Sequence, residues 1–561
     1  MNSVSRLLYV PGEVSSFRQL LPNPLLASIV GSLTEAGHSS EIWDYGTVAT
    51  LARYCPEGES VRLDSVRNAP GTRGVAGWWD RALQFWNPRP PGCTNPVVQA
   101  QVLNEITNRL AAVRGLGFVV LALDSANTCR TARKVAEGLK QRRPEICVFA
   151  VGDFVEVLAQ SAPEHWAPFD GLCVGDCELS LIDLAACLKR RTAWRSISNL
   201  VFRRGDRVVH TPQEYLSNWS TWPFPSYDPG LYPALQGMQK FHFFAVEEQR
   251  ARSYRGKQQT STDGMAPWSN VKPPERIAEE MRRLSDSCGV YCCRLHGSTA
   301  SMAHVHGLAN HLLARGVHVL HSRGCDAPIL DQAALERLAK SGCDTVTFHV
   351  ESGSQRLLED FYARSFGISQ VETVLRASRD AGLFTVIHLT YPCPQDDRHT
   401  KAETLRLLER TRPHAAVVSV PEFRLGLVWS RNLPSQRSGF ESCPRHRGSH
   451  WFAPRGHGVN AYLRSSRRGE ARAADQARQA QEALLLEIED RGILTCFSEE
   501  AILAARAGGY VGREGQFLRM LQTCDASELA ALAGEFNDRI CSPASRPGWH
   551  PYVPMRAAAG N

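Results

Sequence analysis

Residues 117–123, Gly-Phe-Val-Val-Leu-Ala-Leu, decide the fold of the first part of this 561-residue chain. The run is almost wholly apolar, which predicts a strand buried on both faces of a sheet. A helical pattern precedes it at 96–113, another follows at 128–141, and a second apolar strand is expected at Ile146–Val151. This alternation is typical of a parallel, doubly wound α/β sheet, which binds its ligands beyond the carboxyl ends of the strands.

The same alternation extends over residues 1 to about 195, which we expect to form one Rossmann-like domain. Its other elements are strands at Arg6–Val10, Ser40–Tyr45 and Gly171–Val174, and helices at 23–36 and from Leu179. A hairpin and a linker are expected over 196–235. The proline-rich run 222–228 (WPFPSYD) cannot continue a helix and predicts an extended connection.

A second alternation with a longer period follows, over residues 236–435. Strands are expected near 240–246, 289–294, 316–321, 344–350, 383–389 and 415–420. Helices are expected near 273–286, 301–315, 331–341, 368–381 and 400–411. Six strand–helix units with right-handed crossovers predict an open, partial (β/α)6 barrel. Residues 436–561 are expected to form an Arg-rich segment and then a helical C-terminal domain.

Composition indicates an ordinary globular protein, with 43% hydrophobic and 22% charged residues and a net charge of only +7. The 17 cysteines lack a disulfide-like rhythm, no signal peptide is evident, and the longest apolar run, 118–123, is too short to span a bilayer. We therefore expect a cytoplasmic protein with reduced thiols and no membrane partner. The arginines concentrated at 431–472 suit an anionic substrate or nucleic acid, but a solvated loop is favoured, and no nucleic acid partner is expected.

Several segments, in order over residues 5–420, resemble the B12-binding (cobalamin-dependent) radical S-adenosylmethionine (SAM) family. In the first domain they are 23–26 (NPLL) with 35–38 (EAGH), 144–153 (PEICVFAVGD) and 169–178 (FDGLCVGDCE). The linker run 222–228 resembles the motif just ahead of the family's radical SAM domain. Within the expected barrel, 350–354 (VESGS) resembles the family's "ESG" element, and 391–394 (YPCP) resembles a later turn.

The resemblance implies two cofactor sites. Cobalamin is expected at the strand ends of the first domain, at Gly152, Asp153, Gly175, Asp176 and Glu178, and the SAM amino acid moiety is expected at Glu351, Ser352 and Gly353. The alternative interpretations are that Gly152 and Gly175 only form tight βα turns, and that Glu351 is a solvated acid in a turn. No D-x-H-x-x-G motif occurs; the nearest string, 397–402 (DRHTKA), lacks the glycine. No histidine of that motif is therefore expected to replace the lower ligand of cobalamin.

The family holds a [4Fe–4S] cluster by C-x3-C-x2-C, but the corresponding segment here, 244–256 (FAVEEQRARSYRG), contains no cysteine. The aligned positions are approximately Gln249, Ser253 and Gly256. No shift of the alignment supplies thiolates, because Cys187 and Cys288 are the nearest cysteines. We therefore expect no cluster.

Other potential metal ligands are better explained as structural residues. Cys173 and Cys177 lie in the first domain, while Cys288, Cys292 and Cys293 are expected to be core cysteines because successive strand residues face opposite ways. A further group, His296, His304, His306 and His311, contains metal-ligating side chains but fits surface and core positions as well. The Arg323–Cys325 string (RGC) lacks a second cysteine at the required spacing.

Two hypotheses for function follow. The first is a cobalamin-binding, radical-SAM-like enzyme of methyltransferase type, acting on a small molecule by non-radical chemistry, because polar methyl transfer needs no cluster. The second is a catalytically degenerate protein that binds cobalamin or SAM as a regulator or scaffold. The sequence identifies no catalytic residues.

Overall fold

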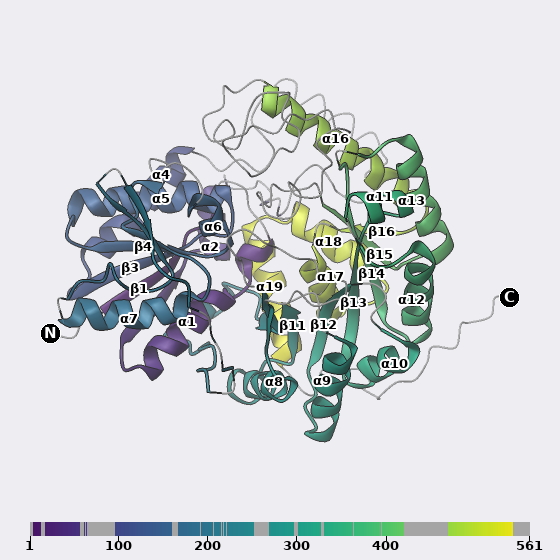
Figure 1. Cartoon of the computed structure of the whole chain (residues 1–561), viewed down its shortest axis with the longest axis horizontal. Coiled ribbons are helices and arrows are strands. Elements are labelled where there is room, and N and C mark those ends of the chain that lie inside the picture. Colours follow the sequence, from purple (N-terminus) through teal and green to yellow (C-terminus); the bar gives the residue numbers. More distant parts are fainter. Residues whose placement is uncertain are drawn as a thin grey trace. The chain divides into compact units, whose positions relative to one another are not determined.

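The computed structural model describes residues 4–12, 17–55, 61, 63, 96–159, 166–190, 192–205, 207–214, 216, 218–219, 221–251, 269–296, 301–326, 330–362, 364–393, 395–419, 469–496 and 498–541. The chain forms two compact units (Figure 1). The first contains residues 1–245 and 519–539, and the second contains 246–518 and 540–561.

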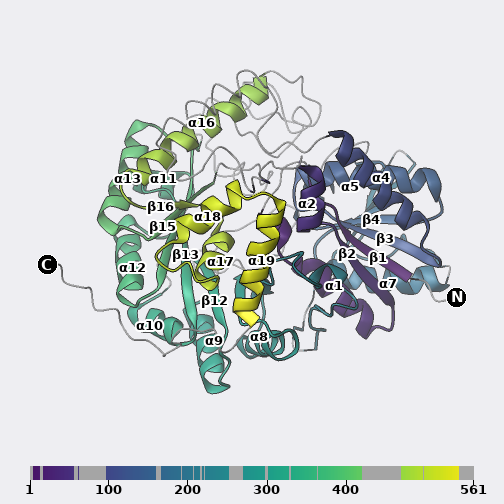
Figure 2. The same ribbon diagram turned by 180° about the vertical axis from the view of Figure 1, so that it is seen from behind.

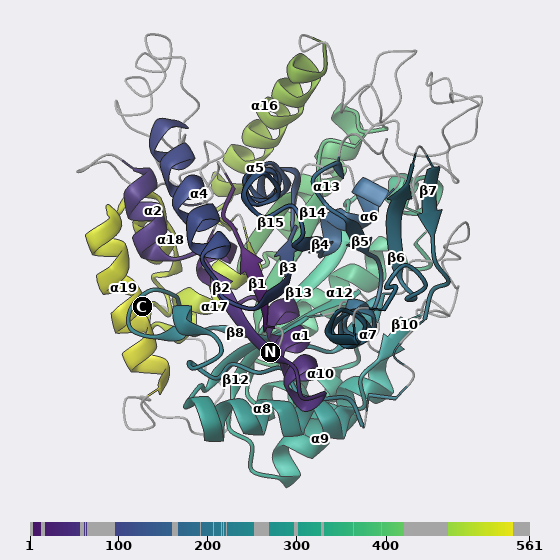
Figure 3. The same ribbon diagram turned by 90° about the vertical axis from the view of Figure 1, so that its left-hand side faces the viewer.

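The first unit is built on a seven-stranded sheet in the order β2-β1-β3-β4-β5-β6-β7 (Figure 3). The strands are β1 (Val4–Tyr9), β2 (Ser39–Asp44), β3 (Leu116–Ala122), β4 (Cys147–Val151), β5 (Gly171–Cys173), β6 (Leu200–Arg204) and β7 (Arg207–His210). The first five in this order pair in parallel, and β6 and β7 form the antiparallel hairpin expected after residue 196. The predicted doubly wound domain is thus confirmed.

Helices cover both faces of this sheet. Helices α1 (Pro24–Glu35) and α7 (Cys177–Arg190) pack together on one face, and α4 (Pro96–Ala111) and α5 (Ala126–Arg142) pack together on the other (Figure 1). The central strand β3 is buried on both faces, as its apolar run predicts. Two short helices, α2 (Val48–Tyr54) and α6 (Asp153–Ala159), were not predicted because each has only seven residues and too little periodicity to detect.

The second unit contains a seven-stranded sheet in the order β16-β15-β14-β13-β12-β11-β8. The strands are β8 (Phe244–Glu247), β11 (Cys292–His296), β12 (Leu320–Asp326), β13 (Cys343–Glu351), β14 (Phe384–Thr390), β15 (Ala415–Ser419) and β16 (Leu494–Cys496). The pairings from β11 to β16 are all parallel. A separate antiparallel pair joins β9 (Gln249–Ala251) to β10 (Ser269–Val271).

The helices that alternate with these strands form the outer layer of the partial barrel (Figure 1). They are α8 (Pro274–Cys288), α9 (Met302–Ala314), α10 (Gln332–Lys340), α11 (Gln355–Asp360), α12 (Ile368–Asp380) and α13 (Arg398–Thr411). Alternate residues of β13, Val346, Phe348 and Val350, are fully buried in the apolar core that this layer forms with the sheet. The six predicted strand–helix units are therefore present.

The described part of the chain after residue 436 is mainly helical, as expected. Its helices are α16 (Gly469–Glu489), α17 (Glu499–Ala507), α18 (Glu514–Thr523) and α19 (Ala526–Cys541). Strand β16, which was not predicted, adds a seventh strand to the barrel sheet beside β15. Helix α17 contacts β12, β13 and β16 on the face away from the outer helices (Figure 2). Most of α19 belongs instead to the first unit.

Two further predictions concern membrane-spanning helices and the Arg-rich segment. No helix among the described residues is both long and apolar enough for a membrane span. The Arg-rich segment 431–472 lies almost entirely outside the described residues.

Candidate functional site

The first unit presents two predicted glycines at the carboxyl ends of its strands. Gly152 has a φ of +106°, and a Cβ there would lie 2.7 Å from the carbonyl oxygen of Leu123, so the packing of β4 against β3 itself requires glycine. Gly175 has a φ of +73°, and no described atom lies within 4 Å of the position that its Cβ would take. The backbone beyond β5 therefore faces open space, as a large flat ligand would need.

The three acidic residues predicted at this edge differ in their surroundings. Asp153 is exposed at the start of α6. The carboxylate of Asp176 is buried and accepts a 2.6 Å hydrogen bond from the backbone N–H of Leu216. The carboxylate of Glu178 is fully buried and accepts a 2.7 Å hydrogen bond from the Ser28 hydroxyl. These last two side chains therefore hold the fold together, and a direct role for them in cobalamin binding stays a prediction.

A buried ion pair lies at the carboxyl end of β2. The Lys240 Nζ atom is 2.7 Å from Asp44 Oδ2, and both side chains are fully buried. The ammonium group also donates 2.9 Å hydrogen bonds to the backbone oxygens of Gln19 and Leu21, while the Tyr232 hydroxyl donates to Asp44. Burial raises the pKa of Asp44 and lowers that of Lys240, and their mutual attraction opposes both shifts. This network fixes the segment after the linker to the sheet.

In the second unit, titratable side chains form a row across the carboxyl ends of three neighbouring strands. Asp326 on β12 is in register with His349 on β13, which is in register with His388 on β14. Paired residues of adjacent parallel strands face the same side, and all three lie opposite the buried face of Phe348 and Val350. This row was not predicted, because strand register cannot be read from a single sequence.

Glu351 ends β13 in a strained conformation. Its φ is +66°, which is rare outside glycine, and the register of β13 with β14 shifts between His349 and Glu351. The Arg364 guanidinium binds both oxygens of the Glu351 carboxylate, and its Nη1 lies 3.4 Å from Asp326 Oδ1. Burial raises the pKa of Asp326, against the attraction of Arg364. Glu351, which we expected to bind the amino acid moiety of SAM, therefore already has a cationic partner in Arg364.

Ser352 and Gly353 shape the turn that follows. The Ser352 hydroxyl accepts a hydrogen bond of 3.2 Å from the Ser354 N–H, and the Gly353 N–H donates one of 3.0 Å to the Thr404 hydroxyl. A Cβ on Gly353 would lie 2.4 Å from the Cα of Thr404, so only glycine allows α13 to approach this closely. The structure thus gives both residues a local packing role, and their contact with SAM stays a prediction.

Helix α17 packs against the inner face of the barrel sheet. At its C-terminal end Arg506 binds Asp344, near the start of β13, through contacts of 2.5 and 2.8 Å. At its N-terminal end Glu499 and Glu500 pair with Arg294, in the middle of β11. The residues between, 501–505, are fully buried. The helix therefore packs against the amino-terminal and middle parts of these strands.

A buried carboxylate, Glu248, lies within residues 244–256, the segment that corresponds to the cluster-binding motif of the family. Glu248 accepts two hydrogen bonds from Arg323 Nη2, at 2.8 and 3.0 Å, and its Oε1 lies 3.1 Å from His304 Nε2. Although burial opposes ionisation, Arg323 and His304 lower the pKa of Glu248 overall. Of the three aligned cluster positions, Gln249 lies in β9, whereas Ser253 and Gly256 lie outside the described residues.

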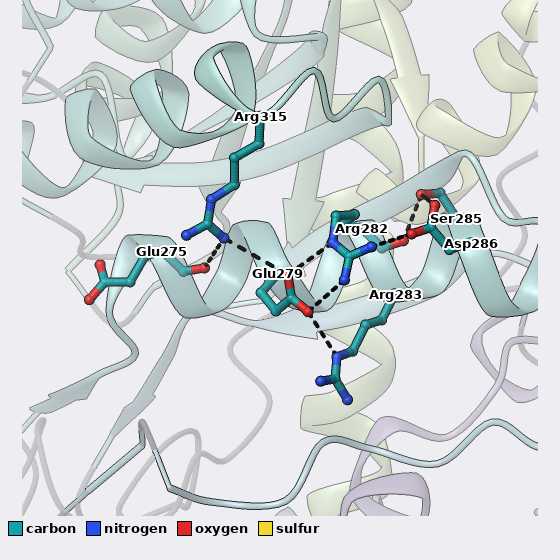
Figure 4. Close-up of polar contacts among 7 residues, drawn as sticks. All are labelled: Glu275, Glu279, Arg282, Arg283, Ser285, Asp286 and Arg315. Atoms are coloured by element: carbon teal, nitrogen blue, oxygen red, sulfur yellow. Dashed lines mark hydrogen bonds and ion pairs between the residues drawn. The ribbon is translucent and has the colours of Figure 1, made fainter.

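The remaining candidates form no metal site. Within the described part of the chain, no three His, Cys, Asp or Glu side chains gather to hold a metal ion. Cys173, Cys177, Cys292 and Cys293 are buried, and burial raises the pKa of the Cys173 thiol to about 12. The charged residues of α8, including Glu279 and Arg282, form an ion-pair network at the surface (Figure 4). Such networks are solvated and do not point to a site.

Comparison with known proteins places these features in a family context. Residues 254–408 match the Radical SAM superfamily. None of the curated protein sequences matches the chain significantly. Among solved structures, the radical SAM methyltransferase TsrM from Kitasatospora setae, with cobalamin and a [4Fe–4S] cluster bound, has a TM-score of 0.60 at 13% identity, and the similarity covers 95% of this chain and 99% of TsrM.

Two further solved structures are similar in fold to this chain. TsrM with its tryptophan substrate and a SAM analogue has a TM-score of 0.53 at 13% identity, covering 75% of this chain and 73% of that one. The cobalamin-dependent SAM radical enzyme OxsB, with aqua-cobalamin and SAM bound, has a TM-score of 0.51 at 13% identity, covering 75% and 54%. The chain therefore contains a radical SAM domain and has the fold of the cobalamin-dependent radical SAM enzymes TsrM and OxsB.

Proposed function

We propose that this chain is a cobalamin-binding, methyltransferase-type enzyme that acts on a small molecule without an iron–sulfur cluster. The observation that carries the proposal is the similarity to TsrM over 95% of the chain, which spans both units. TsrM is a methyltransferase whose structures contain cobalamin, a SAM analogue and tryptophan. The 13% identity leaves the substrate open, so transfer of these properties to this chain is part of the proposal.

The first unit is suited to cobalamin. The open position at Gly175 lies beyond the carboxyl end of β5, the edge where sheets of this class bind their ligands. Gly152 and the exposed Asp153 lie at the end of the neighbouring strand β4, so the three residues offer backbone and a carboxylate to one ligand. When bound, cobalamin would supply a transferable methyl group.

The second unit is not suited to the cluster of its family. Three thiolates are required, yet no cysteine occurs between Cys187 and Cys288. Oxygen and nitrogen side chains are poor substitutes for three soft ligands, so no step through a cluster is assigned. We propose that SAM or the substrate binds at the mouth of this barrel, beside Glu351, Ser352 and Gly353. Because Arg364 already binds Glu351, we expect this carboxylate to anchor a SAM ammonium group only weakly.

The experiment is a visible-absorbance titration of the full chain with hydroxocobalamin, for the wild type and Gly175→Leu. We expect the wild type to retain cobalamin through gel filtration and the variant to lose it, because a side chain would fill the open space beyond β5. Gly37→Leu is the matched control: Gly37 also has a positive φ and an open Cβ position but ends α1. If the wild type leaves the cofactor free, the proposal is refuted.

The second hypothesis, a non-catalytic regulator or scaffold, predicts that no methylated product forms. SAM with a deuterated methyl group is incubated with the cobalamin-loaded protein, a reductant and candidate small-molecule nucleophiles, starting with tryptophan. Transfer of the label to a nucleophile supports the enzyme. Stoichiometric cobalamin binding with no transfer to any nucleophile supports the regulator.

A further inference from the structure

Three titratable side chains of the second unit lie in a row across neighbouring strands. Asp326, His349 and His388 lie side by side on β12, β13 and β14, towards the carboxyl ends of these strands. The residue two before Asp326 is Gly324, and a Cβ there would lie 2.8 Å from His349 Nε2. The absence of a side chain at Gly324 therefore makes the space that the His349 ring occupies.

The two imidazoles are held next to each other. Their ring centroids are 5.1 Å apart with an interplanar angle of 59°, and both residues are half-buried. His388 Nε2 lies 2.8 Å from the hydroxyl of Ser419 on β15, which fixes that ring. Imidazole and carboxylate side chains are the groups that most often accept and donate protons in catalysis, so this row has the chemistry for proton transfer.

Carboxylates face His349 from two elements. Burial raises the pKa of Asp326, whereas Arg364 and His349 lower it. Burial also opposes ionisation of Glu499, at the start of α17, but Arg294 and then His349 lower its pKa overall despite the nearby Glu500. The other charged groups at the mouth are Glu351 with Arg364, and Arg294 with its neighbour His296. Carboxylates of two elements, β12 and α17, thus lie near the His349 ring, the combination of groups found in histidine–carboxylate catalytic pairs.

We infer that His349 is a catalytic general base that accepts the proton lost by the substrate nucleophile, with His388 and Ser419 positioning its ring. This inference rests on the proposed function, in which a neutral substrate nucleophile that carries hydrogen loses a proton as it gains a methyl group. The bond between the nucleophile and its hydrogen breaks, and the electron pair stays on the nucleophile. The imidazole lone pair of His349 forms the new N–H bond, and solvent later takes the proton from the partly exposed ring.

The test uses diethyl pyrocarbonate, which modifies neutral, accessible imidazoles, with modification of each histidine followed by peptide mass spectrometry between pH 5 and 8. We expect His349 to react at pH 8 and to become protected as the pH falls. In Asp326→Asn the rate at pH 6 should rise about threefold or more, because loss of a neighbouring acid favours the neutral ring. The exposed His399 on α13 is the internal control and should not respond to the substitution.

Glu499→Gln provides a second variant in case Asp326→Asn disturbs the strand end, and circular dichroism verifies folding. The inference is overturned if His349 stays unreactive at pH 8 while His399 reacts, or if neither substitution changes its rate at pH 6. Cobalamin retention is measured on the same samples. Failure of the wild type to bind cobalamin would refute the proposed function, whereas normal binding with an unresponsive His349 would refute only the general base.

Discussion

The buried Lys240–Asp44 pair allows a prediction whose size follows from the structure. In Asp44→Asn the Lys240 ammonium keeps its two backbone acceptors, Gln19 and Leu21, but loses its counter-charge in a fully buried position. Removing one partner of such a pair typically costs about 3–5 kcal/mol. Lys240→Met should cost less than Asp44→Asn, because the remaining Asp44 can take up a proton, as the direction of its pKa shift favours, and still accept from Tyr232 and Gly46.

The assay is urea unfolding of the two single variants and the double variant, with hydrogen exchange of α1 and β2 to localise the transition to the first unit. We expect the double variant to be more stable than Asp44→Asn, because it no longer buries an unpaired charge. The exposed pair Arg53–Glu105 is the matched control, and breaking it should cost less than about 1 kcal/mol. Loss of less than 1 kcal/mol in Asp44→Asn, or a double variant less stable than it, would refute the reasoning.

Three further predictions concern the second unit. Burial lowers the pKa of His321 to about 4, so below pH 6.5 the unfolded chain takes up a proton that the native chain excludes. From pH 7 to pH 5 the unfolding free energy of the wild type should therefore fall by about 2 kcal/mol more than that of His321→Gln, as measured by urea unfolding at each pH. Gly353→Ala should destabilise the barrel by about 1–3 kcal/mol in thermal unfolding, because its Cβ would meet the backbone of Thr404, whereas Gly289→Ala, with open space around it, should cost only its backbone strain. In any methyl transfer that the protein performs, His349→Gln should lower kcat about 10²–10⁴-fold and abolish the acidic limb of the pH–rate profile; an unchanged profile would count against a general base.

The sequence predicted the two α/β alternations well because runs such as 117–123 are buried on both faces and have no competing interpretation. It failed for β16, whose three residues carry no detectable period and whose place beside β15 depends on a long-range pairing. It also failed to show that α17 packs on the inner face of the barrel, since an apolar, alanine-rich helix fits any buried environment.

For the site, the glycines and the "ESG" element lie at the carboxyl ends of strands, as expected, and their role in binding stays a prediction. Acidic residues there were less informative. Asp176 and Glu178 have the residue type of ligand-binding groups, but they bond Leu216 and Ser28, which are distant in the chain. The Asp326–His349–His388 row depends on the register of three strands, which no local pattern encodes.

The central claim is that this fold uses cobalamin without an iron–sulfur cluster, and elemental analysis tests it most directly. The full-length protein is reconstituted anaerobically with hydroxocobalamin, iron and sulfide, desalted, and analysed for cobalt and iron per chain. We predict cobalt near one and iron near zero, because the segment that should bind the cluster has no thiolates. Iron near four per chain, or cobalt near zero, would contradict the account.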